Sequence, residues 1–528
     1  MRKSALLSGM LAGSLLLSPT VLAETNQTES AIQKKETAVT IQELPGPVKK
    51  TVDKLIAYKP ELKQIPAEIE KRKDPLLSQE KYSLSFTKNE LRVSAEIGVD
   101  GTLLGFHMYN SDEKSEKRPS DALAEEKATA FLKQVVGNEN EYRISHIRDG
   151  GYMAIEHDGK EKVTAYASVI LLPLVNGIPL AGSHSIQVDI NQEGQVTNWF
   201  NHDGNLDKSA FPKPENLISR ETAEQAFLRA INMELVYDEE EGATRGPNGP
   251  ENVNPVLKYR MTAKQIEAVT GNPIEDDYKE YTETKPVNGE AKVLRITSAK
   301  EAEKLLQTEL GIQVNGLRFR EEGDGVKQAK LYEWTTENNT VYAVQTTDKG
   351  EVLQFGCLSV HNAEKFKETG TISEEAAAAK ALDFIKKYLP ANVKEVQISY
   401  RGRSAYPDWV DESKIPSNNV LLVGFTEMKD GIPITNRAIH AWIDLATGKI
   451  EQVSLYIPLQ SVLPDSSKKI DRDKAASIYL ESHPLQLQYV WPHMLDQKAK
   501  KPMLVYAPLD DYYVEYIDAL SGKVVTSR

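Results

Sequence analysis

The second half of the chain repeats the first half, and this duplication limits the possible folds more than any other feature of the sequence. Matching segments keep the same order in both halves, at an offset of roughly 250 residues, whereas chance similarity would scatter. Three matching pairs are residues 101–106 (GTLLGF) with 350–355 (GEVLQF), 176–180 (NGIPL) with 430–434 (DGIPI), and 266–271 (IEAVTG) with 517–522 (IDALSG). The sequence therefore predicts a tandem duplication, with copies at residues 45–290 and 291–528.

The first residues are typical of a secretion signal. Arg2 and Lys3 precede an uncharged, mainly apolar run that ends in small residues. This order predicts a signal peptide at residues 1–23, cleaved after Ala23, and a polar segment at residues 24–44. An uncleaved membrane anchor is the alternative, although the run is short for a span of about 20 residues. We therefore expect a secreted protein, or one on the extracellular face of the cell envelope, that meets the membrane only during export.

Composition excludes some partners and one kind of stabilisation. The formal net charge is −13, and an acidic surface argues against nucleic acid as a partner because phosphate contacts require lysine and arginine. Cys357 is the only cysteine, so no internal disulfide can form and stability must come from packing. We expect its thiol to be a small buried apolar group, with a nucleophile as the alternative. With 528 residues, the chain is too long for a single core.

Each copy alternates short helical patterns with pairs of strand patterns. In the second copy, three segments have apolar residues at helical spacing. These predicted helices are residues 298–310, 373–388 and 471–482. Strand patterns flank turns at Gly350, Gly448 and Gly522, where glycine supplies the positive φ of a tight hairpin. Helix-plus-hairpin units of this kind predict an α+β fold, with antiparallel sheets and helices packed on one face.

Two local patterns carry a resemblance to known modules. Ser373, followed by Glu375 and Ala376, starts a helix, and residues 443–450 (IDLATGKI) form the turn of a later strand pair. Together these patterns resemble a PepSY-type module. With the NGIPL and DGIPI segments and the twofold repeat, both copies resemble the YcdB/YcdC repeat family of secreted bacterial proteins. In the first copy, residues 189–194 (DINQEG) depart from the Asp-x-x-Thr-Gly turn.

The resemblance implies export, tandem PepSY-like units and no established activity, and it carries over no catalytic residues. PepSY modules elsewhere are linked to propeptides and to the restraint of peptidases. We therefore expect a secreted, non-catalytic protein that binds peptide or protein partners, or restrains a peptidase, at the cell envelope. The expected partners are a secreted peptidase or another envelope protein. The alternatives are a structural cell-surface component and an unrecognised extracellular hydrolase with carboxylates from both copies in a cleft.

The sequence lacks the common patterns of hydrolases and nucleotide-binding proteins. His-Glu-x-x-His, Gly-x-Ser-x-Gly and the phosphate-loop pattern are absent. Ser183 and His184 are neighbours, but neighbours on a strand point to opposite faces. Residues 189–194 begin like a calcium loop, yet Phe200 stands where a bidentate Glu is needed, which favours a hairpin turn. We therefore predict no catalytic residue, no cofactor and no metal site. Metal binding is the alternative to a solvated or core position for His361, His440, His483 and His493.

Two further segments are candidates for contact with a partner. Tyr406 and Trp409 lie in a segment without a clear counterpart in the first copy. Exposed aromatic side chains can anchor a partner, and the alternative is that they cap the edge of a core. The acidic run at residues 238–241 is predicted to be a solvated, mobile loop, with a calcium or partner site as the alternative.

Overall fold

The structure is a computed structural model of the chain. It describes residues 40–73, 80–110, 117–137, 139–157, 160–182, 184–201, 204, 206–239, 245–246, 249–250, 255–262, 264–274, 279–324, 329–359, 372–402, 406–414, 419–456, 462–494, 497–509 and 515–526. The predicted signal peptide at residues 1–23 and most of the polar segment at residues 24–44 lie outside the described residues. Within the described ranges, no helix is both long enough and apolar enough to cross a membrane.

Strands dominate the fold, so the predicted α+β class is wrong. Strands hold 44% of the residues and helices 24%. The two large sheets have nine and thirteen strands, and the larger is mixed, because β10 (Asn232–Glu239) pairs in parallel with β22 (Ile432–Asp444). The physical reason is element length. The longest α-helix among the described residues, α1 (Gly46–Tyr58), has 13 residues, whereas β5 (Tyr142–His157) and β6 (Lys160–Val175) have 16 each, so more residues find their hydrogen bonds in sheets than in helices.

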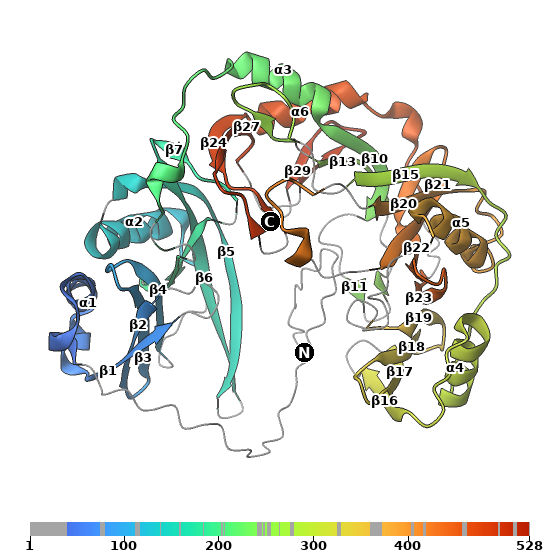
Figure 1. Cartoon of the computed structure of the whole chain (residues 1–528), viewed down its shortest axis with the longest axis horizontal. Helices are drawn as coiled ribbons and strands as arrows, with labels where there is room; N and C mark the ends of the chain where they lie inside the picture. The colour runs from blue at the N-terminus through green and yellow to red at the C-terminus, as the bar shows by residue number, and fades with distance from the viewer. Residues whose placement is uncertain are drawn as a thin grey trace, which may run out of the picture.

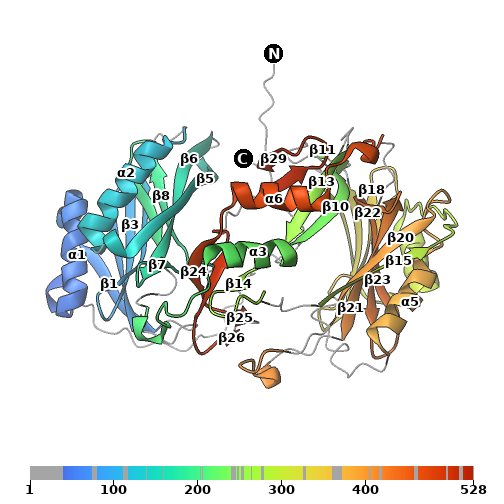
Figure 2. The same ribbon diagram turned by 90° about the horizontal axis from the view of Figure 1, so that it is seen from above.

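The nine-stranded sheet has the order β1-β2-β3-β4-β9-β8-β6-β5, with β7 paired to β6. Its other elements are β1 (Ala67–Lys73), β2 (Glu80–Lys88), β3 (Leu91–Gly98), β4 (Leu103–Asn110), α2 (Asp121–Phe131), β7 (Ile178–Pro179), β8 (Ile186–Asn191) and β9 (Val196–Phe200). Side chains alternate along the strands: in β2, Tyr82, Leu84 and Phe86 are buried and their neighbours are not. Both α1 and α2 lie on the outer side of this sheet, where Phe131 packs against Trp199 (Figures 1 and 2).

The thirteen-stranded sheet runs β16-β17-β18-β19-β23-β22 and then branches. One branch continues through β21, β20 and β15, and the other through β10, β13, β28 and β29. Its further elements are β15 (Lys279–Pro286), α4 (Ala299–Leu305), β16 (Arg318–Asp324), β17 (Ala329–Thr335), β18 (Val341–Thr347), β19 (Val352–Cys357), α5 (Glu374–Ile385), β20 (Glu395–Gly402), β21 (Val420–Lys429) and β23 (Ile450–Ser454). Phe355 and Phe425 are fully buried in its core, with residues of α4 and α5.

The two large sheets share a strand order. Each sheet begins with four strands that are consecutive in the chain, β1 to β4 or β16 to β19. The next strand in the sheet is the last of the unit in the chain, β9 or β23, and the remaining strands follow in reverse chain order. The nine-stranded sheet continues as β9-β8-β6-β5, and the first branch of the other sheet as β23-β22-β21-β20. A tandem duplication would produce this agreement. β15 adds one more strand to the second sheet, by pairing along its whole length with β20.

Between the large sheets, the last modules of the two copies exchange strands. Their elements are α3 (Arg220–Ala230), β13 (Pro255–Thr262), β14 (Ile266–Glu267), α6 (Arg472–Ser482), β24 (Gln486–Val490), β27 (Met503–Ala507), β28 (Glu515–Asp518) and β29 (Val524–Thr526). In β13, Tyr259 lies opposite Ile517 of β28, and in β27, Tyr506 lies opposite Ile266 of β14. Residues 255–259 (PVLKY) match residues 502–506 (PMLVY), so Tyr259 corresponds to Tyr506, and Ile266 corresponds to Ile517. The same tyrosine–isoleucine pairing is therefore made twice, each time between one copy and the other.

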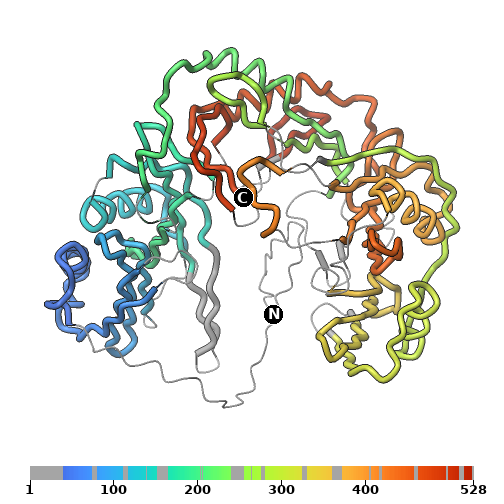
Figure 3. Tube along the Cα trace, viewed as in Figure 1, coloured from blue at the N-terminus to red at the C-terminus, as the bar shows by residue number. Residues whose placement is uncertain are grey.

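Backbone hydrogen bonds repeat the same exchange. The amide of Ala519 donates to the carbonyl of Leu257, and the amide of Ala268 to the carbonyl of Leu504, both at 2.9 Å. Each exchanged module also pairs with a strand segment of the other copy. Tyr237 of β10 forms a parallel β-bridge with Ile434 of β22, and Tyr489 of β24 forms a parallel β-bridge with Leu180. Figure 3 shows the green and red segments of the chain side by side in the middle of the molecule. The copies are therefore interlocked and do not form two separate domains in series.

Four short strands form two separate pairs. β11 (Arg245–Gly246) pairs with β12 (Gly249–Pro250), and β25 (His493–Met494) pairs with β26 (Gln497–Lys498).

Candidate binding pocket

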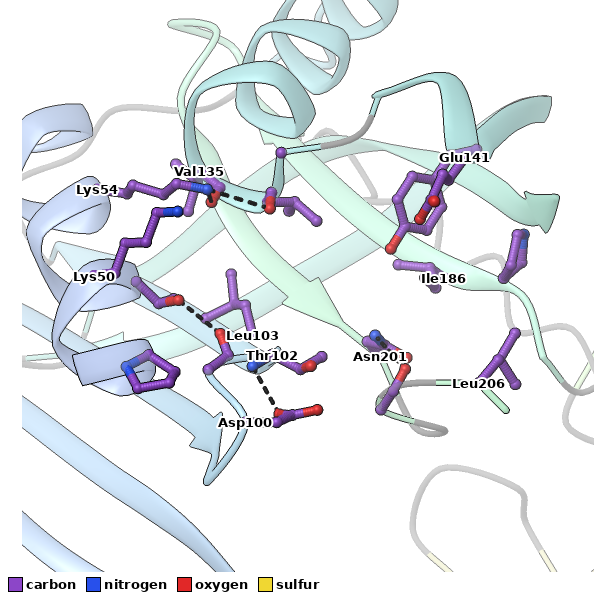
Figure 4. A pocket seen from close by; sticks show the side chains of 18 of the residues that line it. Lys50, Lys54, Asp100, Thr102, Leu103, Val135, Glu141, Ile186, Asn201 and Leu206 are labelled. Carbon is purple, nitrogen blue, oxygen red and sulfur yellow. Dashed lines mark hydrogen bonds between the residues drawn. The ribbon is translucent and has the colours of Figure 1, made fainter. Parts of the chain in front are cut away.

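A pocket of ≈ 570 Å³ opens at one end of the nine-stranded sheet (Figure 4). Its wall is built by the first turns of α1, the turn between β3 and β4, the end of the π-helical turn Leu132–Val136, the start of β5, the end of β6 and the segment after β9. Sites for small ligands usually have volumes of about 300–1,000 Å³. The pocket is therefore large enough for a few side chains of a bound peptide.

Helix α1 presents one side of its first turns to the pocket. Lys50 and Lys54 are four residues apart, which places them on the same side of the helix, and Figure 4 shows them next to each other. Between them, the Thr51 hydroxyl donates to the carbonyl of Gly101 at 2.6 Å. This hydrogen bond joins the helix to the turn between β3 and β4.

The three lysines of the wall differ in their partners. The Nζ of Lys54 donates to two carbonyl oxygens at the end of the π-helical turn, at 3.1 and 3.4 Å, where a cation is favoured by the exposed carbonyls. The Nζ of Lys208 lies 2.6 Å from the Oε1 of Glu141, and both side chains are half exposed. Lys50 is exposed and has no hydrogen bond or ion pair with any other residue that the structure describes. Its ammonium group is therefore the cation available to a ligand.

Much of the remaining wall is apolar. Pro47, Leu103, Leu174 and Leu206 contribute to it. Burial raises the pKa of Tyr142, and the negative charge of the neighbouring Glu141 raises it further, so the phenol stays neutral and able to donate a hydrogen bond. An anionic group attached to an apolar body would find complementary contacts here.

His184 forms the side of the pocket that faces the second copy. It is 3% exposed, and its ring centroid lies 5.4 Å from that of His493 and 6.1 Å from that of Trp491. The pocket wall is therefore continuous with a contact between the copies. Ser183, its sequence neighbour, lies outside the described residues.

The turn that holds the pocket floor requires a glycine. Gly101 has a φ of +88°, and a Cβ at this position would lie 2.7 Å from the carbonyl oxygen of Pro47. We expect Gly101→Ala to lower the free energy of unfolding by about 2 kcal/mol, because backbone strain adds to a contact with rigid backbone. Gly105→Ala is the matched control, since its Cβ would meet nothing nearer than the Glu96 Cβ at 3.6 Å. Urea denaturation measures both variants, and equal losses of stability would contradict the argument.

Apart from His184 and His493, whose ring centroids are 5.4 Å apart, the described residues that the sequence singled out for chemistry lie apart from each other. Cys357 is fully buried beside Tyr342 and Trp442, which confirms the expected buried thiol. Burial lowers the pKa of His440, and the Nδ1 of His483 lies 3.2 Å from a carbonyl oxygen of its own helix. His361 lies outside the described residues. In the part of the chain that is described, no three His, Cys, Asp or Glu side chains gather as metal ligands would.

The two acidic segments have structural roles. Residues 192–195 form the turn between β8 and β9, as the hairpin prediction required, and the Oδ1 of Asn191 accepts the amide of Gln195 at 2.7 Å. Asp238 lies within β10, and its Oδ2 is 3.1 Å from the Nζ of Lys258, so the predicted solvated loop is wrong for this residue. The reason is that β10 joins the larger sheet. Residues 240–241 of the run lie outside the described residues.

The aromatic pair is only partly available to a partner. Tyr406 and Trp409 are both partly buried, beside the buried Val410.

Sequence reasoning missed the pocket because its wall comes from segments that are far apart in the chain. The only local signal was the spacing of Lys50 and Lys54, which many solvated helix faces share. No pattern in the sequence showed that the turn at Gly101 and the segment around Leu206 would meet this helix.

Residues 318–456 match the family model of the YcdB, YcdC repeated domain. A YcdB/YcdC repeat domain is therefore present in the second copy. It extends from β16 to just beyond β23, the part whose strand order the nine-stranded sheet shares. A solved structure of an uncharacterized protein from Eubacterium rectale ATCC 33656 is similar at 12% identity, covering 59% of this chain and 100% of its own, with a TM-score of 0.27. The chain has no match among curated proteins.

Proposed function

We propose that this protein is exported, that it binds peptide segments of partner proteins without catalysing a reaction, and that the pocket beside α1 is the binding site. The proposed partners are a secreted peptidase or another protein of the cell envelope. The observation that carries the proposal is Lys50, which has no hydrogen bond or ion pair among the described residues and lies in the wall of a partly apolar pocket of ≈ 570 Å³.

Charge complementarity favours a ligand with a carboxylate. Lys50, Lys54 and Lys208 face only Asp100 and Glu141, so the wall has a surplus of one positive charge in a chain whose formal net charge is −13. A hydrogen bond between an ammonium and a carboxylate is stronger than one between neutral groups. The apolar wall would take up the side chains next to that carboxylate. A peptide that ends in an apolar residue with a free C-terminus has this chemistry.

The site is largely formed before a ligand arrives. Lys54 is held by two carbonyl groups and Lys208 by Glu141, so only Lys50 has to be ordered by the ligand. Fixing one long side chain costs about 0.5–1.5 kcal/mol on binding. Preorganisation of this kind favours binding of a short segment at moderate affinity.

The test uses two labelled peptides, Gly-Ser-Gly-Leu-Pro-Leu with a free C-terminus and the same peptide as its C-terminal amide. Fluorescence anisotropy with the purified chain is expected to show the free acid binding at least about tenfold more tightly, a difference of ~1.4 kcal/mol. Lys50→Glu is expected to remove this preference. Lys300→Glu is the matched control, because Lys300 is exposed on α4 and does not line the pocket.

Two results would overturn the proposal. Equal affinity for the acid and the amide, or equal effects of the two substitutions, would show that the pocket does not recognise the C-terminal carboxylate of a peptide. Cleavage of either peptide during the assay, followed by mass spectrometry, would show that the protein is not a passive binder.

A further inference from the structure

The helix-free face of the nine-stranded sheet carries an unbroken row of polar residues that crosses eight strands. Each member lies directly opposite the next in the strand register. In order from β1 to β5, the row is Glu68, Ser85, Ser94, His107, Asn198, Asp189, Ser168 and Arg148. Neighbouring strands are about 4.8 Å apart, so the row presents polar groups at a regular spacing perpendicular to the strands.

One half of the row is fixed by internal hydrogen bonds. Ser168 is fully buried and Asp189 is 5% exposed, and the Ser168 hydroxyl donates to the Oδ1 of Asp189 at 2.5 Å. The Nδ2 of Asn198 donates to the Oδ2 of the same carboxylate at 3.2 Å, and Gln187 donates to its Oδ1 at 2.8 Å. The amide of Asn198 is thereby oriented, with its side-chain oxygen turned away from the carboxylate.

The other half of the row is open and forms a groove of ≈ 360 Å³. Ser85, Ser94 and His107 line it, together with Arg92 and Tyr109 from the adjacent row. Arg92 is exposed, and its guanidinium makes no hydrogen bond or ion pair with another described residue. The groove therefore offers hydroxyl groups, an imidazole, an aromatic ring and one uncompensated positive charge.

The second sheet shows that the fold does not require this row. At the corresponding register positions Ala343, Gly356, Trp442 and Leu422 replace Ser94, His107, Asp189 and Ser168, whereas Glu333 and Gln452 keep polar groups in the places of Ser85 and Asn198. Both sheets nevertheless have the same strand order. The second sheet therefore interrupts the row at four positions, and the continuous row is found in the first sheet.

We propose that this groove binds a strand of an acidic polysaccharide whose sugars carry carboxylates, laid across β2, β3 and β4. The hydroxyl and imidazole groups of the groove exchange hydrogen bonds with sugar hydroxyls, and the ring of Tyr109 offers a flat surface for a sugar face. The guanidinium of Arg92 pairs with a carboxylate of the sugar through two parallel hydrogen bonds. A uronate polymer fits better than a glycerol phosphate polymer, because each uronate sugar offers several hydroxyl groups to the polar row besides its carboxylate, whereas a glycerol phosphate unit offers one.

The binding test titrates the full chain with three oligomers of matched length: an oligogalacturonate, a neutral gluco-oligosaccharide and an oligo(glycerol phosphate). Isothermal titration calorimetry is expected to show the oligogalacturonate binding at least about tenfold more tightly than the other two. Arg92→Gln is expected to remove this advantage, and Ser94→Ala, which introduces the residue of the second sheet, to weaken binding about threefold. Lys88→Gln is the matched control, because Lys88 is exposed on the same sheet and alternates with Thr87 to the opposite face.

Several outcomes would overturn the inference. Preference for the phosphate oligomer would show that the groove binds a phosphate polymer instead. Equal binding of the neutral oligomer would show that Arg92 does not recognise a carboxylate. No binding of any oligomer at millimolar concentration would exclude the site. Unchanged thermal unfolding of Arg92→Gln keeps a loss of binding distinct from a loss of fold. Lys50→Glu is expected to leave polysaccharide binding unchanged, so failure of the peptide site and failure of this site can be distinguished.

Discussion

Neither half of the chain is expected to form its last module when it is produced alone, as residues 24–274 or as residues 275–528. The amides of Ala268 and Ala519 donate to carbonyl groups of the opposite copy, and both amides lose these acceptors in the separated halves. The apolar core around α3 and α6 is also shared, with Phe227 stacked on Tyr479 at 6.2 Å. The core of each large sheet, by contrast, lies within one of these two halves, at residues 44–199 and 287–453.

Amide hydrogen exchange is the measurement. Protection of Ala268 and Ala519 is expected to fall by at least two orders of magnitude in the separate halves and to return when they are mixed. Size-exclusion chromatography is expected to show a one-to-one complex with a Kd below about 1 μM. Ile266→Asp and Ile517→Asp, at fully buried positions of the two exchanged pairs, are expected to prevent the complex. Full protection in either isolated half would contradict the exchange.

Glu309→Gln is expected to destabilise the second copy by about 2–3 kcal/mol at neutral pH. Glu309 is 9% exposed, and Lys292 and Lys387 each place an Nζ 2.5 Å from its carboxylate, while the Tyr388 hydroxyl donates at 2.7 Å. Burial by itself raises the pKa of Glu309, but the hydrogen bonds from the two lysines and the tyrosine outweigh it and lower the pKa from 4.5 to about 2. The carboxylate therefore joins the turn after α4 to the end of α5.

The sign of the pH dependence follows from the depressed pKa. A carboxylate with a lowered pKa in the folded state stabilises fully above the ordinary value of 4.5, and this contribution disappears as the pH falls toward 2. The difference between Glu309→Gln and the unsubstituted chain is therefore expected to shrink between pH 4.5 and pH 2. Urea denaturation at a series of pH values measures it. Glu337→Gln, at an exposed position, is the control, and a difference that stays constant with pH would contradict the assignment.

Local structure was predicted best where a few neighbouring residues decide it. Ser373 was expected to cap a helix, and its hydroxyl accepts the amide of Ala376 at 3.2 Å. Gly350, Gly448 and Gly522 were expected at hairpin corners, and all three have a positive φ. Caps and tight turns depend on the chemistry of two to four successive residues, so the sequence contains the information directly.

The fold class was predicted wrongly because strand length and pairing depend on partners outside the segment. The helices have strong local signals, whereas the 16-residue strands β5 and β6 gain their length by pairing with each other from end to end. β10 joins the larger sheet through one parallel bridge, between Tyr237 and Ile434. No local pattern in the sequence predicts this bridge. The pocket beside α1 escaped prediction for the same reason, since Lys50 and Leu206 meet only through the fold.

The sequence by itself determined that two similar units follow one another, where their helices begin and where their hairpins turn. The sequence does not show whether the strands of each last module pair within their own copy or with the other copy. Tyr259 and Tyr506 occupy equivalent positions, as do Ile266 and Ile517, so pairing within a copy and pairing between copies present the same side chains to each strand. Local interactions are equal in the two arrangements, and only the geometry of the connecting segments and the packing of α3 on α6 select the exchange. The pairing between copies is therefore decided only by the tertiary structure.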